Sequence, residues 1–402
     1  MDDFDPLSPD FQANPYPVYD RLRASTPLYY WAPGNIWFAT NYETCVALLK
    51  HGQLGHEVRH APSREDPGRA ESPARHAPLV DMQRSWMLLR DPPTHTRLRS
   101  LVHEAFTPRM IDQLQPRIQS VCDQLIDAAL QKGEIDIVED FAAPLPVMVI
   151  ADMFGVPESD RGALRRWSRD LADTVELNAS AETYDRGTVA TTEFSAYLRD
   201  LARERRRQPR QDLMTALVRA EDHGDSLTEQ EVISTCILLL VAGHETSTNF
   251  IGNGMSALLR NPEQLEMLKS RPELGRCAIE ELLRYDSPVQ TTFRTVLHEM
   301  EFHGRRFTPG TSVAFMLGAA NHDPAVFDDP RRLDITRDPN PHLSFSYGIH
   351  YCLGAPLARL EGQVAIQTLL RRAPKIELMD HHPAYRKTWA ARGLESLPVR
   401  LG

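Results

Sequence analysis

The stretch from Thr228 to Asn261 constrains the fold more than any other, because it has the pattern of one long helix with an apolar middle. Thr228 and Glu231 form the pattern of a capping box, and Asn261 followed by Pro262 ends the helical pattern. At about 1.5 Å per residue, such a helix is about 50 Å long and can cross the whole molecule. A helix with so apolar a middle must be buried, so other elements have to enclose it.

Helical patterns also dominate the rest of the chain. Further helices are expected at Thr94 to Phe106, Pro108 to Lys132, Pro144 to Phe154, Pro157 to Asn178, before and through Arg203 to Arg207, and at Ala355 to Arg372. Short strands are expected at Asn35 to Thr40 and between Pro288 and Thr311, where β-branched and aromatic residues alternate. The stretch from His51 to Pro93 is expected to be a long irregular excursion with one short helix, and Asp323 to Pro341 an ordered coil. We therefore expect a mainly α fold with a smaller β-rich region. A length of 402 residues could make two domains, but single domains of this size are common, and we expect one domain over residues 1–402.

Composition argues against several classes of function. The net charge of -10 argues against general affinity for nucleic acid or for anionic membranes, since both need a basic face. The apolar stretch from Cys236 to Gly243 is too short for the roughly 20 residues that cross a bilayer, and residues 1–20 lack the pattern of a signal peptide. The five cysteines form no CxxC pair, which argues against a zinc site or a disulfide framework: Cys45, Cys122, Cys236, Cys277 and Cys352. We expect a cytoplasmic protein with neither nucleic acid nor membrane as a partner.

A motif near the C-terminus carries the clearest chemical signal. Phe345, Gly348, His350, Cys352 and Gly354 stand in the order FxxGxHxCxG, directly before the last expected helix. Small residues beside a metal-bound thiolate let backbone amides approach the sulfur, and a helix N-terminus favours thiolate over thiol. A lone cysteine is usually a buried small hydrophobe, but five positions at fixed spacing argue against that alternative. The motif resembles the haem-binding loop of the cytochrome P450 family, which implies haem b with Cys352 as its iron ligand, a ligand that favours O–O cleavage.

Inside the long helix, the segment AGHET from Ala242 to Thr246 resembles the oxygen-activation segment of P450s. Glycine within a helix costs about 1 kcal/mol relative to alanine, and a planar cofactor close to the backbone would explain its presence. Without the cysteine motif, an ordinary polar break in the helix would be the simpler interpretation. The resemblance implies that Thr246 hydrogen-bonds near the distal oxygen and that Glu245 links it to solvent. His244 is expected to be packed or solvent-linked, because no HExxH spacing follows it.

Glu281 and Arg284 form an ExxR pair with one helical turn between them. Exposed pairs of this kind are common and contribute only about 0.2–0.5 kcal/mol. The resemblance implies a structural role instead, in which this pair and Arg337 together hold the coil behind the haem.

The two haem propionates need cationic or hydrogen-bonding partners when they are buried. The HxxxR pattern of DPPTHTRLR matches the bacterial family's propionate-binding helix, and two further positions match other contacts, although each could otherwise be a surface charge. The residues expected beside the haem are His95, Arg99, Arg294, His350, Ala242, Phe345, Cys352 and Gly354.

Similarity to the family also suggests where substrate would lie. On the long helix, Leu238, Val241 and Ala242 would form an apolar ceiling over the iron, although core packing would give the same pattern. Val289, Gln290 and the excursion from Arg84 to Leu89 would supply other walls. An apolar pocket with few polar groups suits a lipid, a terpenoid or a polyketide.

The resemblance covers nearly the whole chain, from NPYPVYDRLR to the last helix, and is greatest to the group with macrolide-hydroxylating and fatty-acyl-cleaving enzymes. It implies a haem-thiolate monooxygenase that hydroxylates or otherwise oxidises an apolar small molecule, with electrons from a separate ferredoxin or flavodoxin and its reductase. A peroxide-using P450 is a second interpretation, but such members often lack the acid–alcohol pair. A haem-thiolate sensor or ligand carrier is a third, for which an added effector or DNA-binding domain would be expected.

Overall fold

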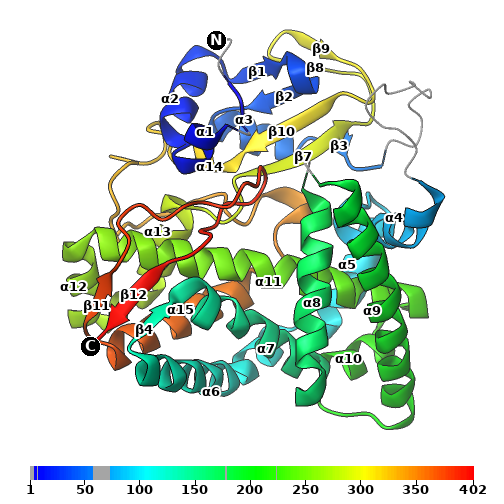
Figure 1. The fold of residues 1–402 in the computed structure, drawn as a ribbon. Coiled ribbons are helices and arrows are strands. Elements are labelled where there is room, and N and C mark those ends of the chain that lie inside the picture. Colours follow the sequence, from blue (N-terminus) through cyan, green and yellow to red (C-terminus); the bar gives the residue numbers. More distant parts are fainter. Residues whose placement is uncertain (1–3, 7, 58–72, 177–178, 223) are drawn as a thin grey trace.

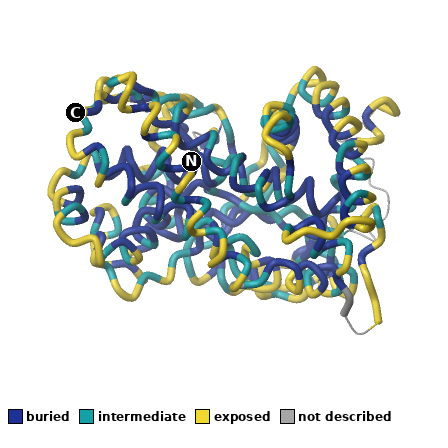
Figure 2. Tube along the Cα trace, turned by 90° about the horizontal axis from the view of Figure 1, so that it is seen from below, coloured by how far each residue is buried: buried dark blue, intermediate teal, exposed yellow. Residues whose placement is uncertain are grey.

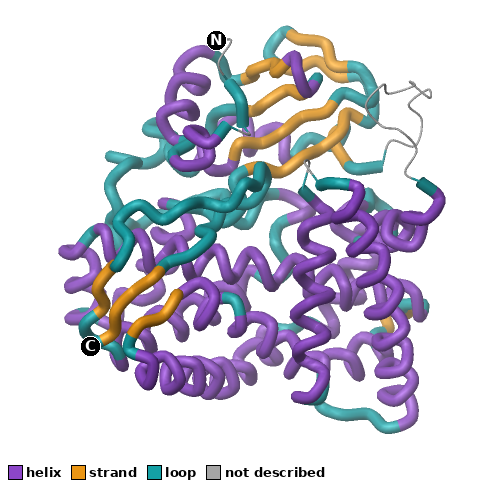
Figure 3. The backbone as a smooth tube through the Cα atoms, viewed as in Figure 1, coloured by secondary structure: helices purple, strands orange, loops and turns teal. Residues whose placement is uncertain are grey.

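The computed structural model describes residues 4–6, 8–57, 73–176, 179–222 and 224–402. Helices form the larger part of the molecule, and most strands lie together on one side of this helical part (Figure 1, Figure 3). The helices are α1 (Pro9–Ala13), α2 (Tyr16–Ser25), α3 (Tyr42–Leu49), α4 (Ala77–Arg84), α5 (Thr94–Ala105), α6 (Pro108–Lys132), α7 (Pro144–Phe154), α8 (Arg161–Ala172), α9 (Ala181–Arg207), α10 (Leu213–Arg219), α11 (Glu229–Arg260), α12 (Pro262–Ser270), α13 (Gly275–Tyr285), α14 (Leu317–Ala320) and α15 (Ala355–Arg372). The strands are β1 (Leu28–Trp31), β2 (Ile36–Ala39), β3 (Leu54–Gly55), β4 (Glu134–Asp136), β5 (Glu221–Asp222), β6 (Asp225–Ser226), β7 (Thr291–Val296), β8 (Met300–Phe302), β9 (Arg305–Phe307), β10 (Ser312–Met316), β11 (Ile376–Leu378) and β12 (Pro398–Leu401).

Helix α11 passes through the middle of the molecule (Figure 1). Its N-terminus has the expected capping box: the Glu231 N–H donates to Thr228 Oγ1 over 3.3 Å, and the Thr228 N–H donates to Glu231 Oε2 over 2.8 Å. Helices α7, α8, α9, α13 and α15 pack around it. Buried residues therefore run along the interior of the fold, and most exposed residues lie on its outside (Figure 2).

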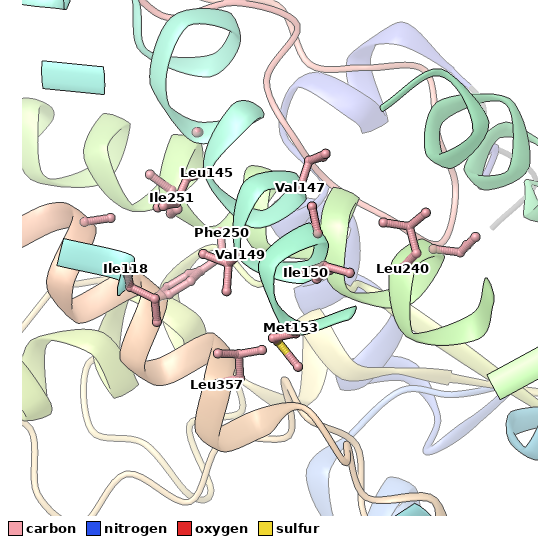
Figure 4. Packing of buried hydrophobic residues seen from close by; sticks show 14 of the residues in the cluster. Ile118, Leu145, Val147, Val149, Ile150, Met153, Leu240, Phe250, Ile251 and Leu357 are labelled. Atoms are coloured by element: carbon pink, nitrogen blue, oxygen red, sulfur yellow. The ribbon is translucent and has the colours of Figure 1, made fainter. Parts of the chain in front are cut away.

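Two glycines set how closely neighbouring helices approach α11. A Cβ on Gly243 of α11 would lie 3.0 Å from Ile150 Cδ1 of α7, and a Cβ on Gly362 of α15 would lie 2.1 Å from Phe250 Cε1 of α11. Figure 4 shows Ile150 and Phe250 within the same apolar cluster. Helices α7 and α15 thus pack closely against α11 at positions where a larger residue would clash.

The main sheet has the strand order β1-β2-β10-β7-β3. Strand β10 runs parallel to β2, and the other neighbours are antiparallel. Strand β3 pairs with the end of β7, with Leu54 opposite Val296 and Gly55 opposite Thr295. This pairing places the residues that follow β3 beside the strand that carries Arg294. A second sheet has the order β11-β12-β4.

The helices expected from the sequence match the structure closely, apart from the ends of one. The stretch from Pro157 to Asn178 forms α8 only over Arg161–Ala172, with a 3₁₀ turn at each end, and residues 177–178 lie outside the described part. The excursion after His51 contains the short helix α4, as expected. Residues 58–72 of this excursion lie outside the described part of the structure.

Two parts of the β-rich region were not anticipated. The N-terminal segment forms α1 and α2 before its strands, and Ser8 caps α1 by accepting a hydrogen bond from the Phe11 N–H. Strand β10 follows the stretch expected to hold strands; its last four residues are all buried, so it lacks the alternation that predicts a half-buried strand. Over the described residues, no helix combines the length and apolar character needed to span a bilayer.

The close packing at Gly362 can be tested by adding one methyl group. Gly362→Ala is expected to lower the free energy of unfolding by about 1–3 kcal/mol, because the methyl group overlaps the buried Phe250 ring. Gly162→Ala is the control, because nothing lies within 4 Å of its Cβ position in α8 and alanine favours helix. The measurement is denaturant unfolding of both variants, and equal midpoints would contradict the prediction.

Candidate active site

The loop before α15 arranges Cys352 by backbone hydrogen bonds. The Cys352 N–H donates to the Phe345 carbonyl over 3.0 Å, and Gly348 has φ of 76° and lies so close to the Leu49 carbonyl that a Cβ would be 2.8 Å from that oxygen. Burial raises the pKa of the Cys352 thiol, while a backbone hydrogen bond from Gly354 and the charge of Arg99 lower it. The Cys352 side chain is nevertheless exposed, so it is deeply surrounded by protein but accessible on one side.

A group of basic side chains lies beside this loop. Arg99 donates to the Tyr351 carbonyl over 2.7 Å, and the rings of His95 and His350 are 4.2 Å apart. Arg294 is buried, which lowers its pKa to about 10. The pKa values of both histidines are lowered by burial and by the neighbouring arginines. The group is rich in hydrogen-bond donors and suited to an anion.

The middle of α11 places an alcohol and an acid side by side. Thr246 Oγ1 donates to the Ala242 carbonyl over 2.6 Å, and Ala242 is exposed although α11 crosses the core. Glu245 accepts a hydrogen bond of 2.6 Å from Arg386. Burial raises the pKa of Glu245, and the charge of Arg386 lowers it.

Glu245 and Arg386 border a pocket of about 670 Å³ between α8, α11 and the loop after β11. Other residues that line it are Arg169, Asp173, Glu176, Thr248 and Asn249. Glu245 therefore lies between the core and a polar pocket on the outer side of α11.

Glu281 and Arg284 form a buried ion pair on α13 that fixes the following coil. Both side chains are fully buried, and two hydrogen bonds of 2.7 and 2.8 Å join them. Glu281 also accepts from Arg337 over 3.2 Å and from Asn340 over 3.1 Å. Arg284 donates to the carbonyls of Asn321, Pro330 and Arg332. The structure thus brings the three expected side chains together in a network that ties the coil to α13.

A family model for cytochrome P450 matches residues 29–270 and 264–374. The chain belongs to the cytochrome P450 family. It is a haem-dependent monooxygenase, so the family, fold class, enzyme class and cofactor expected from the sequence are confirmed.

Named relatives match this P450 over nearly its whole length. The biotin biosynthesis cytochrome P450 of Bacillus subtilis is 42% identical, covering 98% of this chain and 97% of the relative. The 6-deoxyerythronolide B hydroxylase of Saccharopolyspora erythraea is 37% identical, covering 98% of each chain. The crystal structure of P450BioI in complex with hexadec-9Z-enoic acid ligated acyl carrier protein has a TM-score of 0.90 at 40% identity, covering 98% of this chain and 99% of that one.

The donor set of this P450 fits haem. His350 Nε2 is buried with no hydrogen-bond partner in the protein, and the arginines beside it have capacity to donate further. Two propionates would supply the acceptors that these donors need. Cys352, with backbone amides directed at its sulfur, is a suitable thiolate ligand for iron.

Gly243 and Gln290 have packing contacts that the sequence did not reveal. A Cβ on Gly243 would lie 3.0 Å from Ile150 Cδ1, so the close approach of α7 also favours glycine there. The amide of Gln290 accepts from Tyr19 and donates to the Ser287 carbonyl, and the residue is 3% exposed, so its side chain is hydrogen-bonded within the core. His244, expected to be packed or solvent-linked, is buried and shares a hydrogen bond of 2.8 Å with Ser168 of α8.

The other expected substrate contacts divide between core and surface. Leu238 and Val241 are buried in the main apolar cluster, whereas Val289 is partly buried and bridges to Ala391. In the segment from Arg84 to Leu89, Leu88 is 43% exposed, while Trp86 and Met87 are buried.

Arg386 is a site residue that the sequence did not reveal. It lies 141 positions from Glu245 in an irregular loop, where no motif marks it. The loop is fixed by Arg392, which is buried and pairs with Asp286 over 2.7 Å, and by the hydrogen bond from the Arg386 N–H to the Gly393 carbonyl. Only the folded structure brings Arg386 to the acid.

The buried ion pair of α13 gives a testable difference in stability. Glu281→Gln is expected to lower the free energy of unfolding by about 3–5 kcal/mol, because it leaves the buried Arg284 without a counter-charge. Glu266→Gln is the matched control, since it removes a mainly exposed i,i+3 pair with Lys269 worth about 0–1 kcal/mol. Denaturant unfolding measures both, and similar losses for the two variants would show that the buried pair does not hold the coil.

Proposed function

We propose that Cys352 is the iron ligand of this P450 and that His95, Arg99, Arg294 and His350 bind the haem propionates. The observation that carries this proposal is that Cys352, which is exposed, lies beside a largely buried group of basic side chains rich in hydrogen-bond donors. Phe345, Gly354 and Ala242 would contact the haem as well, the last because it is exposed in the middle of α11. Glu281, Arg284 and Arg337 would support the loop, and residues 1–402 would act as one catalytic domain.

Glu245 and Thr246 would take part in proton delivery, Glu245 by passing protons and Thr246 by accepting a hydrogen bond. Bound haem supplies the reductive activation of dioxygen and the transfer of one oxygen atom to substrate. The Thr246 hydroxyl donates to the Ala242 carbonyl, so its oxygen lone pairs are left to accept a hydrogen bond from a proton donor. Glu245 borders the polar pocket on the outer side of α11, from which it could receive protons. Arg386 would hold the carboxylate towards that pocket and oppose the effect of burial on its pKa.

The substrate that we propose is an apolar chain, lipid-like or polyketide-like. The relatives include an enzyme of polyketide biosynthesis in Bacillus subtilis, and a neighbouring structure contains myristic acid. Leu238, Val241, Ala242 and Val289 would supply apolar wall residues, which suits such a molecule. Electrons would come from a separate ferredoxin or flavodoxin with its reductase. The five free cysteines agree with a cytoplasmic location.

The thiolate can be tested by spectroscopy. The dithionite-reduced protein under carbon monoxide is expected to show the red-shifted Soret band of thiolate-bound haem, and Cys352→Ser to lose that shift because serine supplies no sulfur. Cys277→Ser is the control, because that cysteine lies on α13 and outside the loop. A red-shifted band that survives in Cys352→Ser would overturn the assignment.

The role of Thr246 can be tested by coupling. Thr246→Ala is expected to lower the rate of product formation by about 10²-fold while reductant is still consumed, because a positioned hydroxyl is lost from proton transfer. Ser234→Ala is the control: Ser234 lies on the same helix and donates to the Glu231 carbonyl, but it is twelve positions before Thr246 and does not border the pocket beside Glu245. The readout is the ratio of product to reductant consumed, and unchanged coupling in Thr246→Ala would contradict the assignment.

A further inference from the structure

His56 lies in the basic group beside the cysteine loop, although no motif marks it. It directly follows β3, whose pairing with β7 sets it next to the strand that carries Arg294. The Leu297 N–H donates to the Gln53 carbonyl over 2.8 Å and fixes the same connection. The His56 ring is 5.0 Å from the His350 ring, edge to face. The segment after β3 is thus held against residues that we assign to the propionates.

Asp91 fixes the backbone of this segment. Its carboxylate accepts the His56 N–H over 3.0 Å and the Glu57 N–H over 2.7 Å. Its carbonyl accepts the His95 N–H over 2.9 Å at the start of α5. Gly55 is required here, because a Cβ would lie 2.5 Å from the carboxylate. Asp91 therefore holds His56 through its carboxylate and His95 through its backbone carbonyl, and only the first contact depends on the acid.

The imidazole of His56 is left with an unused hydrogen-bonding atom. Its Nε2 is buried and has no partner in the protein, as is also true of His350 Nε2 in the same group. Burial, with the charges of Arg294 and His95, lowers the pKa of His56 to about 3, so the ring is neutral. An unsatisfied buried polar atom costs about 1–3 kcal/mol, and a nearby carboxylate would satisfy it.

We propose that His56 is a fifth residue that anchors haem, by donating a hydrogen bond from its ring to a propionate, and that Asp91 is its positioning residue. The inference rests on the haem site proposed above and extends it to a segment outside the recognised motifs. It explains why a ring whose Nε2 is buried and has no partner in the protein is held beside four other donors.

Haem release separates the hydrogen bond from the packing of the ring. The variants are His56→Phe, which keeps a ring but removes its N–H, and His56→Gln, which keeps a donor. Transfer of haem from the ferric holoenzyme to excess apomyoglobin is expected to be about 10-fold faster for His56→Phe, and close to the wild-type rate for His56→Gln. A tenfold change corresponds to about 1.4 kcal/mol, near the lower end for a hydrogen bond to a charged group. His51→Ala is the control in the same segment and should release haem at the wild-type rate.

Asp91→Asn tests the positioning role. It is expected to speed haem release, and to add nothing when combined with His56→Phe, because both changes remove the same contact. Wild-type release by His56→Phe, or equal rates for His56→Phe and His56→Gln, would overturn the proposal. The carbon monoxide spectrum distinguishes failure of the His56 proposal from failure of the proposed haem site. If His56→Phe keeps the red-shifted band and releases haem at the wild-type rate, only the role of His56 is rejected. If the wild-type protein shows no red-shifted band, the haem site itself is rejected.

Discussion

A helix that is buried over most of 32 residues must be enclosed by other elements on nearly every side, and α11 is such a helix. Its apolar residues gain free energy only if neighbouring helices approach closely, and glycines on α11 and α15 allow that approach. The same helix carries Ala242, Glu245 and Thr246 at its middle. The packing that stabilises the fold therefore also fixes the positions of Glu245 and Thr246 relative to the cysteine loop. Small changes in the packing of α7 or α15 would move Glu245 and Thr246 as well.

Charge is handled differently on the two sides of the cysteine loop. Behind it, Glu281 and Arg284 neutralise each other, and the remaining hydrogen-bonding capacity of the pair is taken up by the coil. In the basic group, burial lowers the pKa of His95 and Arg294 and the charge of Asp91 partly opposes this, while the Asp91 carboxylate also accepts backbone N–H groups. In the first network the two opposite charges are paired within the protein, which stabilises the fold. The second is complete only with an anion, which is the property expected of a cofactor site.

Much of the fold and the centre of the site could be predicted from sequence, and physical reasons explain the rest. The long helix, its capping box and the last helix follow local rules of periodicity and capping, so their boundaries were predicted well. The cysteine motif and the ExxR pair have fixed spacing and were recognised for that reason. Arg386, Asp91 and His56 act through contacts between distant segments, which spacing does not encode. The packing contacts of Gln290 and Gly243 could not be predicted, because a polar residue satisfied in the core and a glycine at a helix contact look the same in sequence as residues at a ligand.

The loop that carries Arg386 has a second attachment. The Trp389 N–H, three residues further on, donates to Glu176 in the connection between α8 and α9, while Arg386 faces Glu245 on α11. The connection between α8 and α9 and Glu245 are therefore coupled through one short piece of backbone. A homologue that lengthened this connection to admit a bulkier molecule would also shift the arginine, so changes in substrate range and in the efficiency with which reductant is used would tend to arise together.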